Sequence, residues 1–507
     1  LIEWRIDGLA YSAAIGTLVE RSALPSVVTC RTADEGGGFE GSGEELVARL
    51  MAAIAGSRKP LAIDVELARV KADAALAALL PALSEGCERG LIFSTHDFTA
   101  RPADLTRQLA DMAGHPLCAI MKAAWRARSL RDNLEAFELT ADYSGAKPLC
   151  ALCMGEFGLP SRVLARKFGG WMTFAALDSG VASAPGQPTL DELKRLYRWD
   201  TLTPDTAVLG VVGYPIGHSM SPPIHNAGLD ALAEQGDPVD AVYLPMPIAP
   251  EYEPFKATIA AFLDMPSLRF RGCSVTIPHK ANLLRFVAER GGDVDPLSDT
   301  IGAANTLVVE PGDTPGEPKL RAFNTDYAAA LDAVCDAMGV DRSGMAGKRV
   351  GVVGAGGASS AIVAAFAAHD ATVVVYNRTV ERAQALVDRF NGQTGKVVAA
   401  PLDKLCDTCC DVLINATPIG MHPKTDATPA PGLFTPDTPQ QNPRVVFDTI
   451  YNPATTVLLA EADAAGRATI SGIEMFVRQA AGQFTAWTGK PAPLDVFEQV
   501  VRDRLAT

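Results

Sequence analysis

A glycine-rich turn in the second half of the chain constrains its fold more than any other stretch. An apolar run from Val350 leads into Gly354-Ala355-Gly356-Gly357-Ala358, an alanine-rich segment follows, and a second apolar run ends in Asn377-Arg378-Thr379. This order is typical of a phosphate-binding βαβ unit, because glycines let the backbone approach a pyrophosphate and a helix N-terminus offers free N–H groups. We therefore expect a doubly wound parallel sheet, although a glycine-rich turn can also simply end a strand.

The end of the second run indicates which dinucleotide would bind. NAD-binding units place Asp or Glu about 20 residues after the glycines, where the carboxylate binds the ribose hydroxyls. This chain has Asn377 and Arg378 at that point. A guanidinium suits a 2′-phosphate, so the sequence predicts NADP as the cofactor.

Composition limits the number of domains and the kinds of partner. With 507 residues, 48% of them hydrophobic, the chain should form several globular domains. Its net charge of -14 argues against nucleic-acid binding, and no apolar run reaches the roughly 18 residues that cross a membrane. We therefore expect a soluble, intracellular protein whose partners are small molecules.

The ten cysteines predict neither a disulfide framework nor a metal centre. Cys150 and Cys153 are three residues apart in an apolar, strand-like run, so their side chains would point to opposite faces. Cys406, Cys409 and Cys410 have no second pair of Cys or His ligands nearby. We expect no bound metal.

The first 200 residues alternate short β-rich runs with alanine- and leucine-rich segments. The runs are residues 1–7, 26–31, 61–67, 90–97, 117–123, 149–154 and 171–177. Parallel strands with crossover helices give this pattern, and its unbroken repetition predicts a (β/α)8 barrel. Because such a barrel has eight strands and we count seven, we expect one further strand before Leu1.

Polar residues gather at the ends of these runs, where barrel active sites lie. They are Glu3, Arg5, Asp7, Arg31, Glu35, Asp64, Glu66, His96, Asp97, Lys122, Ser161, Arg162, Ser183 and Gln187. Lys122 differs from the others because it lies inside an apolar run, where a lysine costs several kcal/mol unless it is deprotonated, paired or functional. A desolvated amine with a lowered pKa forms a Schiff base with a ketone, and a histidine such as His96, titrating near neutrality, can accept and return a proton. Alternatively, His96 is a core histidine bonded to Asp97.

The motifs of this half resemble those of type I 3-dehydroquinate dehydratase, in the same order. They are Glu3-Trp4-Arg5-Ile6-Asp7, Thr29-Cys30-Arg31, Ser94-Thr95-His96-Asp97-Phe98, Lys122, the stretch from Met154 to Arg162, and Ser183-Ala184-Pro185-Gly186-Gln187. The resemblance implies an imine between Lys122 and the substrate ketone, with His96 as general base and acid. It also implies that the substrate hydroxyls and carboxylate are held by Glu3, Arg5, Arg31, Arg162, Ser183 and Gln187, with Arg162 on the carboxylate.

The second half places further polar residues in loops after its predicted strands. They are Ser219 and Ser221, Thr276 and Lys280, Asn305, and Thr325 and Asp326. A Lys and an Asp beside hydroxyls and amides, ahead of an NADP site, could move a proton next to a hydride donor. Alternatively, the two serines only cap a helix and the two charges only face solvent.

These segments resemble shikimate dehydrogenase, and so do residues 415–421, 448–453 and 472–479. The resemblance implies that Lys280 and Asp326 are the catalytic pair and that the substrate is held by Ser219, Ser221, Thr276, Asn305, Thr325, Tyr451 and Gln479. For NADP it implies the glycine turn from Gly354 to Ala358, Asn377, Arg378, Thr379, Thr417, Met421, Gly472 and Met475.

The two resemblances together imply a fused enzyme of the shikimate pathway, as in plants. We predict a dehydratase barrel over residues 1–200, a substrate-binding domain over 206–328 completed by helices in 473–507, and an NADP-binding domain over 329–472. The alternatives are a dehydrogenase that prefers quinate or oxidises dehydroshikimate, and a quinate-pathway regulator that binds ligands without turnover. A regulator would be expected to lack Lys122, His96, Lys280 or Asp326, and all four are present.

Overall fold

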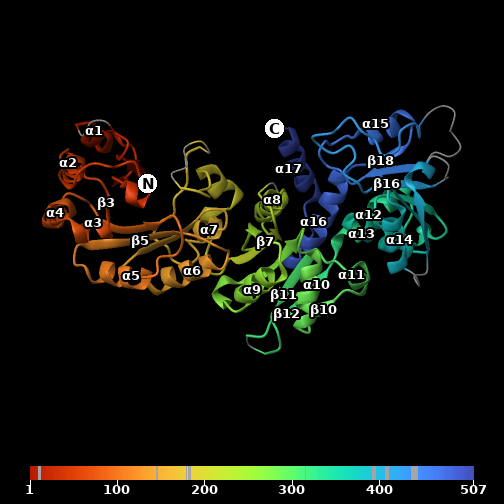
Figure 1. Ribbon diagram of the computed structural model, residues 1–507, viewed down its shortest axis with the longest axis horizontal. Coiled ribbons are helices and arrows are strands. Elements are labelled where there is room, and N and C mark those ends of the chain that lie inside the picture. Colours follow the sequence, from red (N-terminus) through yellow and green to blue (C-terminus); the bar gives the residue numbers. More distant parts are fainter. Residues whose placement is uncertain are drawn as a thin grey trace. The chain divides into compact units, whose positions relative to one another are not determined.

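The computed structural model divides the chain into two compact units, Leu1–Thr206 and Ala207–Thr507 (Figure 1). It describes residues 1–9, 13–143, 147–178, 180, 184–217, 219–314, 316–390, 395–405, 410–434 and 443–506. Within these residues, no helix is long and apolar enough to cross a membrane.

Unit 1 is built on a parallel sheet whose six strands follow one another in sequence order. The strands are β1 (Ile2–Arg5), β2 (Ser26–Thr29), β3 (Ala62–Glu66), β4 (Leu91–Asp97), β5 (Cys118–Arg126) and β6 (Leu149–Met154). The helices between and after them are α1 (Ala13–Arg21), α2 (Gly43–Ile54), α3 (Leu67–Ala72), α4 (Ala74–Glu85), α5 (Leu105–Gly114), α6 (Asp132–Tyr143) and α7 (Leu159–Val163). The predicted parallel βα architecture is confirmed.

The sheet of unit 1 is strongly curled. β1 and β5 are four strand spacings apart along it, which would be about 19 Å in a flat sheet. Yet a Glu3 carboxylate oxygen on β1 lies 3.7 Å from the Lys122 amine on β5. Curling therefore gathers the inner-face side chains of distant strands around one point.

Strand alternation separates an apolar outer face from a charged inner face. Phe93, Met121 and Trp125 belong to the core that the helices cover. Ser94 follows Phe93 on β4, and Lys122 follows Met121 on β5. Ser94 and Lys122 are paired in register and point to the other face of the sheet. Apolar and charged residues one position apart can therefore both be buried without meeting.

The segment 171–177, which we predicted as a strand, is not one. The Trp171 N–H donates to the Leu149 carbonyl at 3.3 Å, and Ala176 forms an isolated bridge with Thr189. One bond at Trp171 and two at Ala176 do not make the repeated ladder that defines a strand. Trp171, Met172 and Phe174 instead pack against the inner face of the sheet. The apolar run reflects this packing.

Unit 2 contains two sheets. The first is mixed, with order β10-β12-β11-β9-β7-β8, and β11 is antiparallel to both neighbours. Its strands are β7 (Ala207–Gly213), β8 (Ala241–Pro247), β9 (Phe270–Val275), β10 (Asp293–Val294), β11 (Thr306–Glu310) and β12 (Lys319–Phe323). The helices that follow these strands are α8 (Ser221–Glu234), α9 (Tyr252–Leu263), α10 (Lys280–Glu289), α11 (Pro296–Ile301) and α12 (Thr325–Met338).

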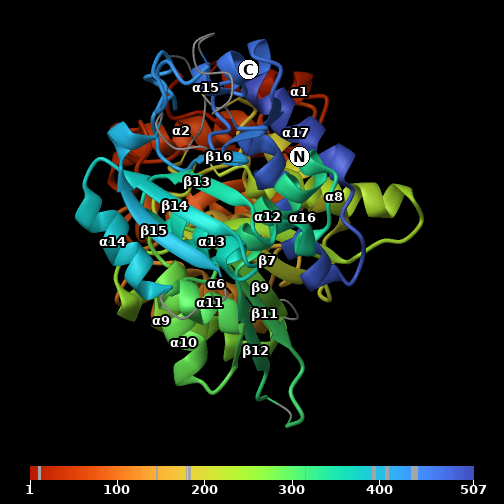
Figure 2. The ribbon, with the colours of Figure 1, turned by 90° about the vertical axis from the view of Figure 1, so that its right-hand side faces the viewer.

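The second sheet is the predicted doubly wound one, with parallel order β15-β14-β13-β16-β17-β18 (Figure 2). Its strands are β13 (Arg349–Val353), β14 (Thr372–Asn377), β15 (Lys396–Pro401), β16 (Val412–Asn415), β17 (Val445–Asp448) and β18 (Ala468–Ile470), with helices α13 (Gly357–Ala367), α14 (Val380–Arg389) and α15 (Val457–Ala464). The terminal helices α16 (Gly472–Thr488) and α17 (Leu494–Ala506) share a core with β7 and α8 of the first sheet.

We expect Trp125→Ala to destabilise the protein by about 3–5 kcal/mol, because Trp125 is fully buried and its removal leaves a large cavity. Trp125→Phe should cost clearly less, since Nε1 has no hydrogen-bond partner to lose among the described residues. Urea unfolding followed by circular dichroism measures both. Equal losses for the two variants would contradict this account of the core.

Candidate active sites

Lys122 lies in a buried polar cluster on the inner face of unit 1. Its Nζ is 2.9 Å from Asp64 Oδ2 and 3.7 Å from Glu3 Oε1, and 4.2 Å from the centroid of the Phe174 ring. The lysine is only 5% exposed. Of the possibilities that the sequence left open, the structure shows that this amine is paired.

Asp64 joins Lys122 to a second cation. Its Oδ1 lies 2.9 Å from an Arg31 nitrogen and accepts a 2.5 Å hydrogen bond from the Ser94 hydroxyl. Burial opposes ionisation, yet Arg31 and Lys122 together hold the pKa of Asp64 below its usual range. Arg31 also contacts Glu66 at 3.2 Å. The inner face thus holds alternating charges that neutralise one another.

His96 pairs with Glu35, through Nδ1 and Oε2 at 2.9 Å. The alternative bond to Asp97 is absent, since the Asp97 carboxylate accepts from Thr99. Burial, helped by the charges of Arg31 and Lys122, holds the pKa of His96 well below its usual value. This environment therefore favours the neutral form of the imidazole, which is the form that can accept a proton.

Glu35 faces the opposite electrostatic situation. Burial, reinforced by repulsion from Glu66, raises the pKa of Glu35 to about 8. A carboxyl group with this pKa next to an imidazole can share a proton with it. The sequence showed Glu35 and Asp64 only as polar residues near strand ends, and their roles depend on a curl that sequence spacing does not reveal.

Arg162 is a buried cation without a carboxylate partner in the described part of the chain. It is 2% exposed, its Nε has no hydrogen-bond partner, and burial lowers its pKa to about 10. A buried unpaired charge is costly unless a ligand neutralises it. Arg162 is therefore suited to a substrate carboxylate.

One pocket brings most of the predicted residues of unit 1 together. Its lining includes Glu3, Arg5, Arg31, His96, Lys122 and Arg162, with Glu35, Phe98 and Phe174 in addition. Ala184 also lines it, whereas Gln187 does not. Ser183 lies outside the described residues.

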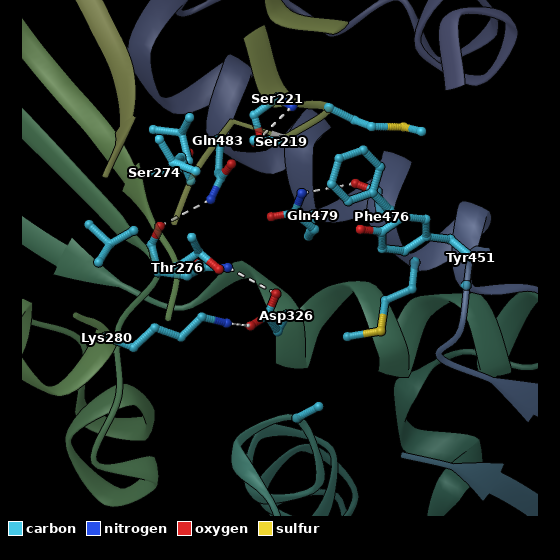
Figure 3. A pocket seen from close by; sticks show the side chains of 18 of the residues that line it. Ser219, Ser221, Ser274, Thr276, Lys280, Asp326, Tyr451, Phe476, Gln479 and Gln483 are labelled. Atoms are coloured by element: carbon cyan, nitrogen blue, oxygen red, sulfur yellow. Dashed lines mark hydrogen bonds and ion pairs between the residues drawn. The ribbon is translucent and has the colours of Figure 1, made fainter. Parts of the chain in front are cut away.

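The second pocket, in unit 2, contains an ion pair at its wall (Figure 3). Lys280, the first residue of α10, and Asp326, in the first turn of α12, face each other with Nζ and Oδ2 2.6 Å apart. Asn305 donates to the other Asp326 oxygen at 3.0 Å. The Lys280 side chain is 30% exposed, so the amine can reach both Asp326 and a bound molecule.

Hydroxyl and amide groups line the rest of this pocket. Of the predicted substrate residues, Ser219, Ser221, Thr276, Asn305, Tyr451 and Gln479 contribute to the lining. Thr325 does not, but its hydroxyl accepts from the Asn305 side chain at 3.0 Å. The sequence missed Ser274 and Gln483, whose side chains also face the pocket (Figure 3). Gln483 lies one helical turn after Gln479, and this spacing is the signal that could have identified it.

The glycine turn has the backbone geometry that a pyrophosphate needs. Gly354 follows β13 with φ of +113°, and a Cβ there would lie 2.9 Å from the Ala416 carbonyl oxygen and 3.0 Å from Thr417 Cγ2. A Cβ on Gly356 or Gly357 would meet nothing within 4 Å, so the start of α13 is open. These residues fit the phosphates of NADP.

The other predicted cofactor residues lie in three places. Arg378, after β14, is exposed and has no hydrogen bond or ion pair among the described residues, which leaves its guanidinium free for a phosphate. Asn377 donates to the Thr379 carbonyl at 2.8 Å. Ala358, Gly472 and Met475 line the pocket of Lys280, whereas Met421 is 45% exposed outside its lining.

A buried carboxylate connects the loops that follow β16 and β17. Asp448 accepts from Asn415 Nδ2 at 3.1 Å and from the Thr456 hydroxyl at 2.7 Å, and burial raises its pKa. The Asn415 side-chain oxygen in turn accepts from the Thr417 backbone and hydroxyl at 3.0 and 2.7 Å. This network fixes the position of Thr417, whose side chain lies next to Gly354.

We expect Arg162→Met to leave the free protein at least as stable as the parent, because a buried unpaired charge disappears. The same change should raise KM for a carboxylate substrate of unit 1 by at least about 30-fold, the lower range for loss of a buried charged contact. Thermal unfolding without ligand and dehydratase kinetics measure the two effects. A large loss of stability would show that Arg162 is already paired in the free protein.

Four family models match successive parts of the chain. They are type I 3-dehydroquinase over residues 1–204, shikimate dehydrogenase substrate binding domain over 211–307, shikimate/quinate 5-dehydrogenase over 339–422, and shikimate 5'-dehydrogenase C-terminal domain over 472–502. The order of these models is the order of the two resemblances seen in the sequence.

Individual relatives agree with this order. A bifunctional 3-dehydroquinate dehydratase/shikimate dehydrogenase, chloroplastic, from Arabidopsis thaliana is 35% identical over 99% of this chain and 79% of its own length. A shikimate dehydrogenase (NADP(+)) from Methanocella arvoryzae is 39% identical over 59% of this chain and 99% of its own. A crystal structure of a shikimate dehydrogenase with NADP+ is similar with a TM-score of 0.50 and 32% identity, covering 60% of this chain and 98% of that one. The chain therefore belongs to the family of bifunctional 3-dehydroquinate dehydratase/shikimate dehydrogenases.

Proposed function

We propose that the chain catalyses two consecutive reactions: dehydration of 3-dehydroquinate to 3-dehydroshikimate in unit 1, and NADPH-dependent reduction of that product to shikimate in unit 2. For the first reaction, the observation that carries the proposal is one pocket that holds the buried amine of Lys122, the imidazole of His96 and Arg162, which has no carboxylate partner among the described residues. No single residue of this set would suffice, since an isolated lysine or histidine has structural explanations.

In unit 1, Arg162 binds the substrate carboxylate and so presents the ketone to Lys122. The Lys122 ammonium first loses one proton to a base of the pocket, and the neutral amine attacks the ketone carbon. That proton and a second one from the nitrogen pass to the ketone oxygen, which leaves as water and gives a protonated imine. This iminium acidifies the adjacent C–H, and His96 removes that proton. The neighbouring C–O bond then breaks, with His96 returning a proton to the departing hydroxyl. Water finally hydrolyses the product imine and restores the amine.

Borohydride reduction tests this reaction directly. With 3-dehydroquinate present, we expect Lys122 to gain the mass of the reduced ligand, because borohydride converts an imine to a stable secondary amine. Mass spectrometry of the peptide that contains Lys122 measures the adduct. Lys122→Met should abolish both the adduct and dehydratase activity while shikimate oxidation by unit 2 continues. An unmodified Lys122 in active wild-type protein would refute the Schiff base.

In unit 2, Lys280 donates a proton to the ketone oxygen, and Asp326 holds the amine charged and in place at 2.6 Å. NADPH, when bound, supplies the hydride. Asn305 orients Asp326, while Ser219, Ser221, Thr276, Tyr451 and Gln479 bind substrate hydroxyls and carboxylate. These assignments rest on the lining of one pocket and on the family resemblance.

We expect Lys280→Met to lower kcat for shikimate oxidation by about 10²–10⁴-fold, the usual contribution of a positioned general acid or base. The affinity for NADP, measured by fluorescence titration, should stay within a few-fold, and dehydratase activity serves as the internal control. A change confined to KM would assign Lys280 to binding alone.

Arg378→Ala should raise KM for NADP by about tenfold or more, because the variant loses a charged contact to the 2′-phosphate. KM for NAD should change little, since NAD lacks this phosphate. Steady-state kinetics with both cofactors give the ratio of the KM for NADP to the KM for NAD. Parallel increases for NAD and NADP would mean that Arg378 contributes to folding of the βαβ unit instead.

Two finer points also belong to the proposal. We infer that shikimate is preferred over quinate, on the strength of Thr276 beside Lys280 in the pocket lining, and kcat/KM for the two substrates tests this. We also infer that the chain works as a monomer in the cytoplasm or a plastid. Light scattering tests the monomeric state, and localisation of the tagged protein tests the compartment.

A further inference from the structure

The reacting nitrogen of unit 1 lies over an aromatic face. Lys122 Nζ is 4.2 Å from the centroid of the Phe174 ring, well inside the range in which a cation is attracted to the ring electrons. Phe174 lines the pocket together with Lys122 and His96 and packs against Leu152 and Met154 of β6. The ring is therefore held in place by the sheet.

Phe174 belongs to the segment 171–177, whose backbone is attached to its surroundings at each end. Trp171 is bonded to Leu149, and Ala176 to Pro188 through its N–H. A segment held by a regular ladder would have to alternate its side chains in step with the neighbouring strands. This irregular segment instead carries a ring to the Lys122 amine.

The charged and titratable groups around Lys122 come from every neighbouring element. They are Glu3 and Arg5 from β1, Arg31 and Glu35 after β2, Asp64 and Glu66 from β3, His96 from β4, Cys150 from β6 and Arg162 from α7. Of these groups, Asp64 accepts a hydrogen bond from the amine at 2.9 Å, and Glu3 lies at ion-pair distance, 3.7 Å. The ring of Phe174 acts on the positive charge alone and accepts no proton.

We propose that the ring of Phe174 stabilises the protonated Schiff base on Lys122, relative to the neutral imine, through a cation–π contact. This inference rests on the proposed Schiff-base reaction. When the amine becomes an iminium, the nitrogen forms a double bond to the substrate carbon and keeps one N–H of the three it had as an ammonium. Its hydrogen bond to Asp64 at 2.9 Å must therefore weaken, whereas the attraction of the ring persists because it depends on the positive charge.

The contact matters because only the charged form does the chemistry. A neutral imine withdraws electrons too weakly to acidify the adjacent C–H, so His96 could not remove the proton efficiently. A carboxylate in place of the ring would stabilise the iminium but could also accept its proton. Phe174 supplies the stabilisation without that loss.

A series of fluorinated phenylalanines at position 174 tests the proposal in the full-length protein. Fluorine withdraws electron density from the ring face while changing its size little, so one, two and three fluorines should weaken the contact stepwise. The readout is the pH at which borohydride trapping of 3-dehydroquinate on Lys122 falls to half, because borohydride reduces the iminium far faster than the neutral imine. We expect this midpoint to move down stepwise, by about one pH unit with three fluorines, which is a tenfold weaker protonation.

Phe168 provides the matched control. Its ring also lies under a lysine, Lys167, at 5.5 Å, but it does not line the pocket. Trifluorination of Phe168 should leave the trapping midpoint unchanged. Thermal unfolding of each protein in both series confirms that the comparison is made between folded molecules.

The outcomes separate this inference from the proposed function. A midpoint that does not depend on fluorination at Phe174, with normal trapping on Lys122, would overturn the role of the ring and leave the Schiff base intact. The absence of any adduct in the wild-type protein would instead overturn the Schiff base. An equal shift in the Phe168 series would attribute the effect to general destabilisation and likewise reject the cation–π contact.

Discussion

The Asp64 carboxylate is the contact on which the charged interior of unit 1 depends. Its side chain is fully buried and lies 2.9 Å from both Arg31 and Lys122. Two cations this close to each other in a low-dielectric interior would repel strongly without an anion between them. Asp64 therefore allows Lys122 and Arg31 to be buried next to each other, while Arg31 also contacts Glu66. Both cations disfavour the charged form of His96.

The lysines of the two pockets differ in how deeply their side chains are buried. The Lys122 side chain is 6% exposed and surrounded by fixed charges, whereas that of Lys280 is 30% exposed and has Asp326 as its ion-pair partner. Burial among fixed charges suits the Schiff base proposed on Lys122, because it limits the access of bulk water to the imine before the elimination is complete. A proton donor needs a short contact to a partner and access to the ligand. The difference in burial follows from the difference in chemistry.

Much of this arrangement could be predicted from the sequence. The doubly wound sheet follows from local motifs, since spacing fixes which end of a strand a residue occupies. Most residues of both pockets were assigned through the resemblance to two enzyme families. Glu35 and Asp64 were visible only as strand-end charges. Their partners come from other strands, and the pairing depends on how strongly the sheet curls.

The segment 171–177 shows another reason why a structure cannot be fully predicted from the sequence. Its apolar residues predict a strand because burial and β-structure use the same residue types. In the structure, Trp171 and Phe174 are partly buried by packing on the sheet, without a ladder. The pKa of His96 illustrates the same limit for electrostatics, since the cations that lower it belong to β5 and to the loop after β2.

The proposed role of Arg162 would couple substrate binding to the stability of the folded protein. Since the described residues place no carboxylate at its guanidinium, an anion that binds there, as proposed for the substrate, would stabilise the folded state. The concentration of the metabolite then helps to set how often unit 1 opens. The same enzyme would then resist unfolding better at a high concentration of its substrate than without it.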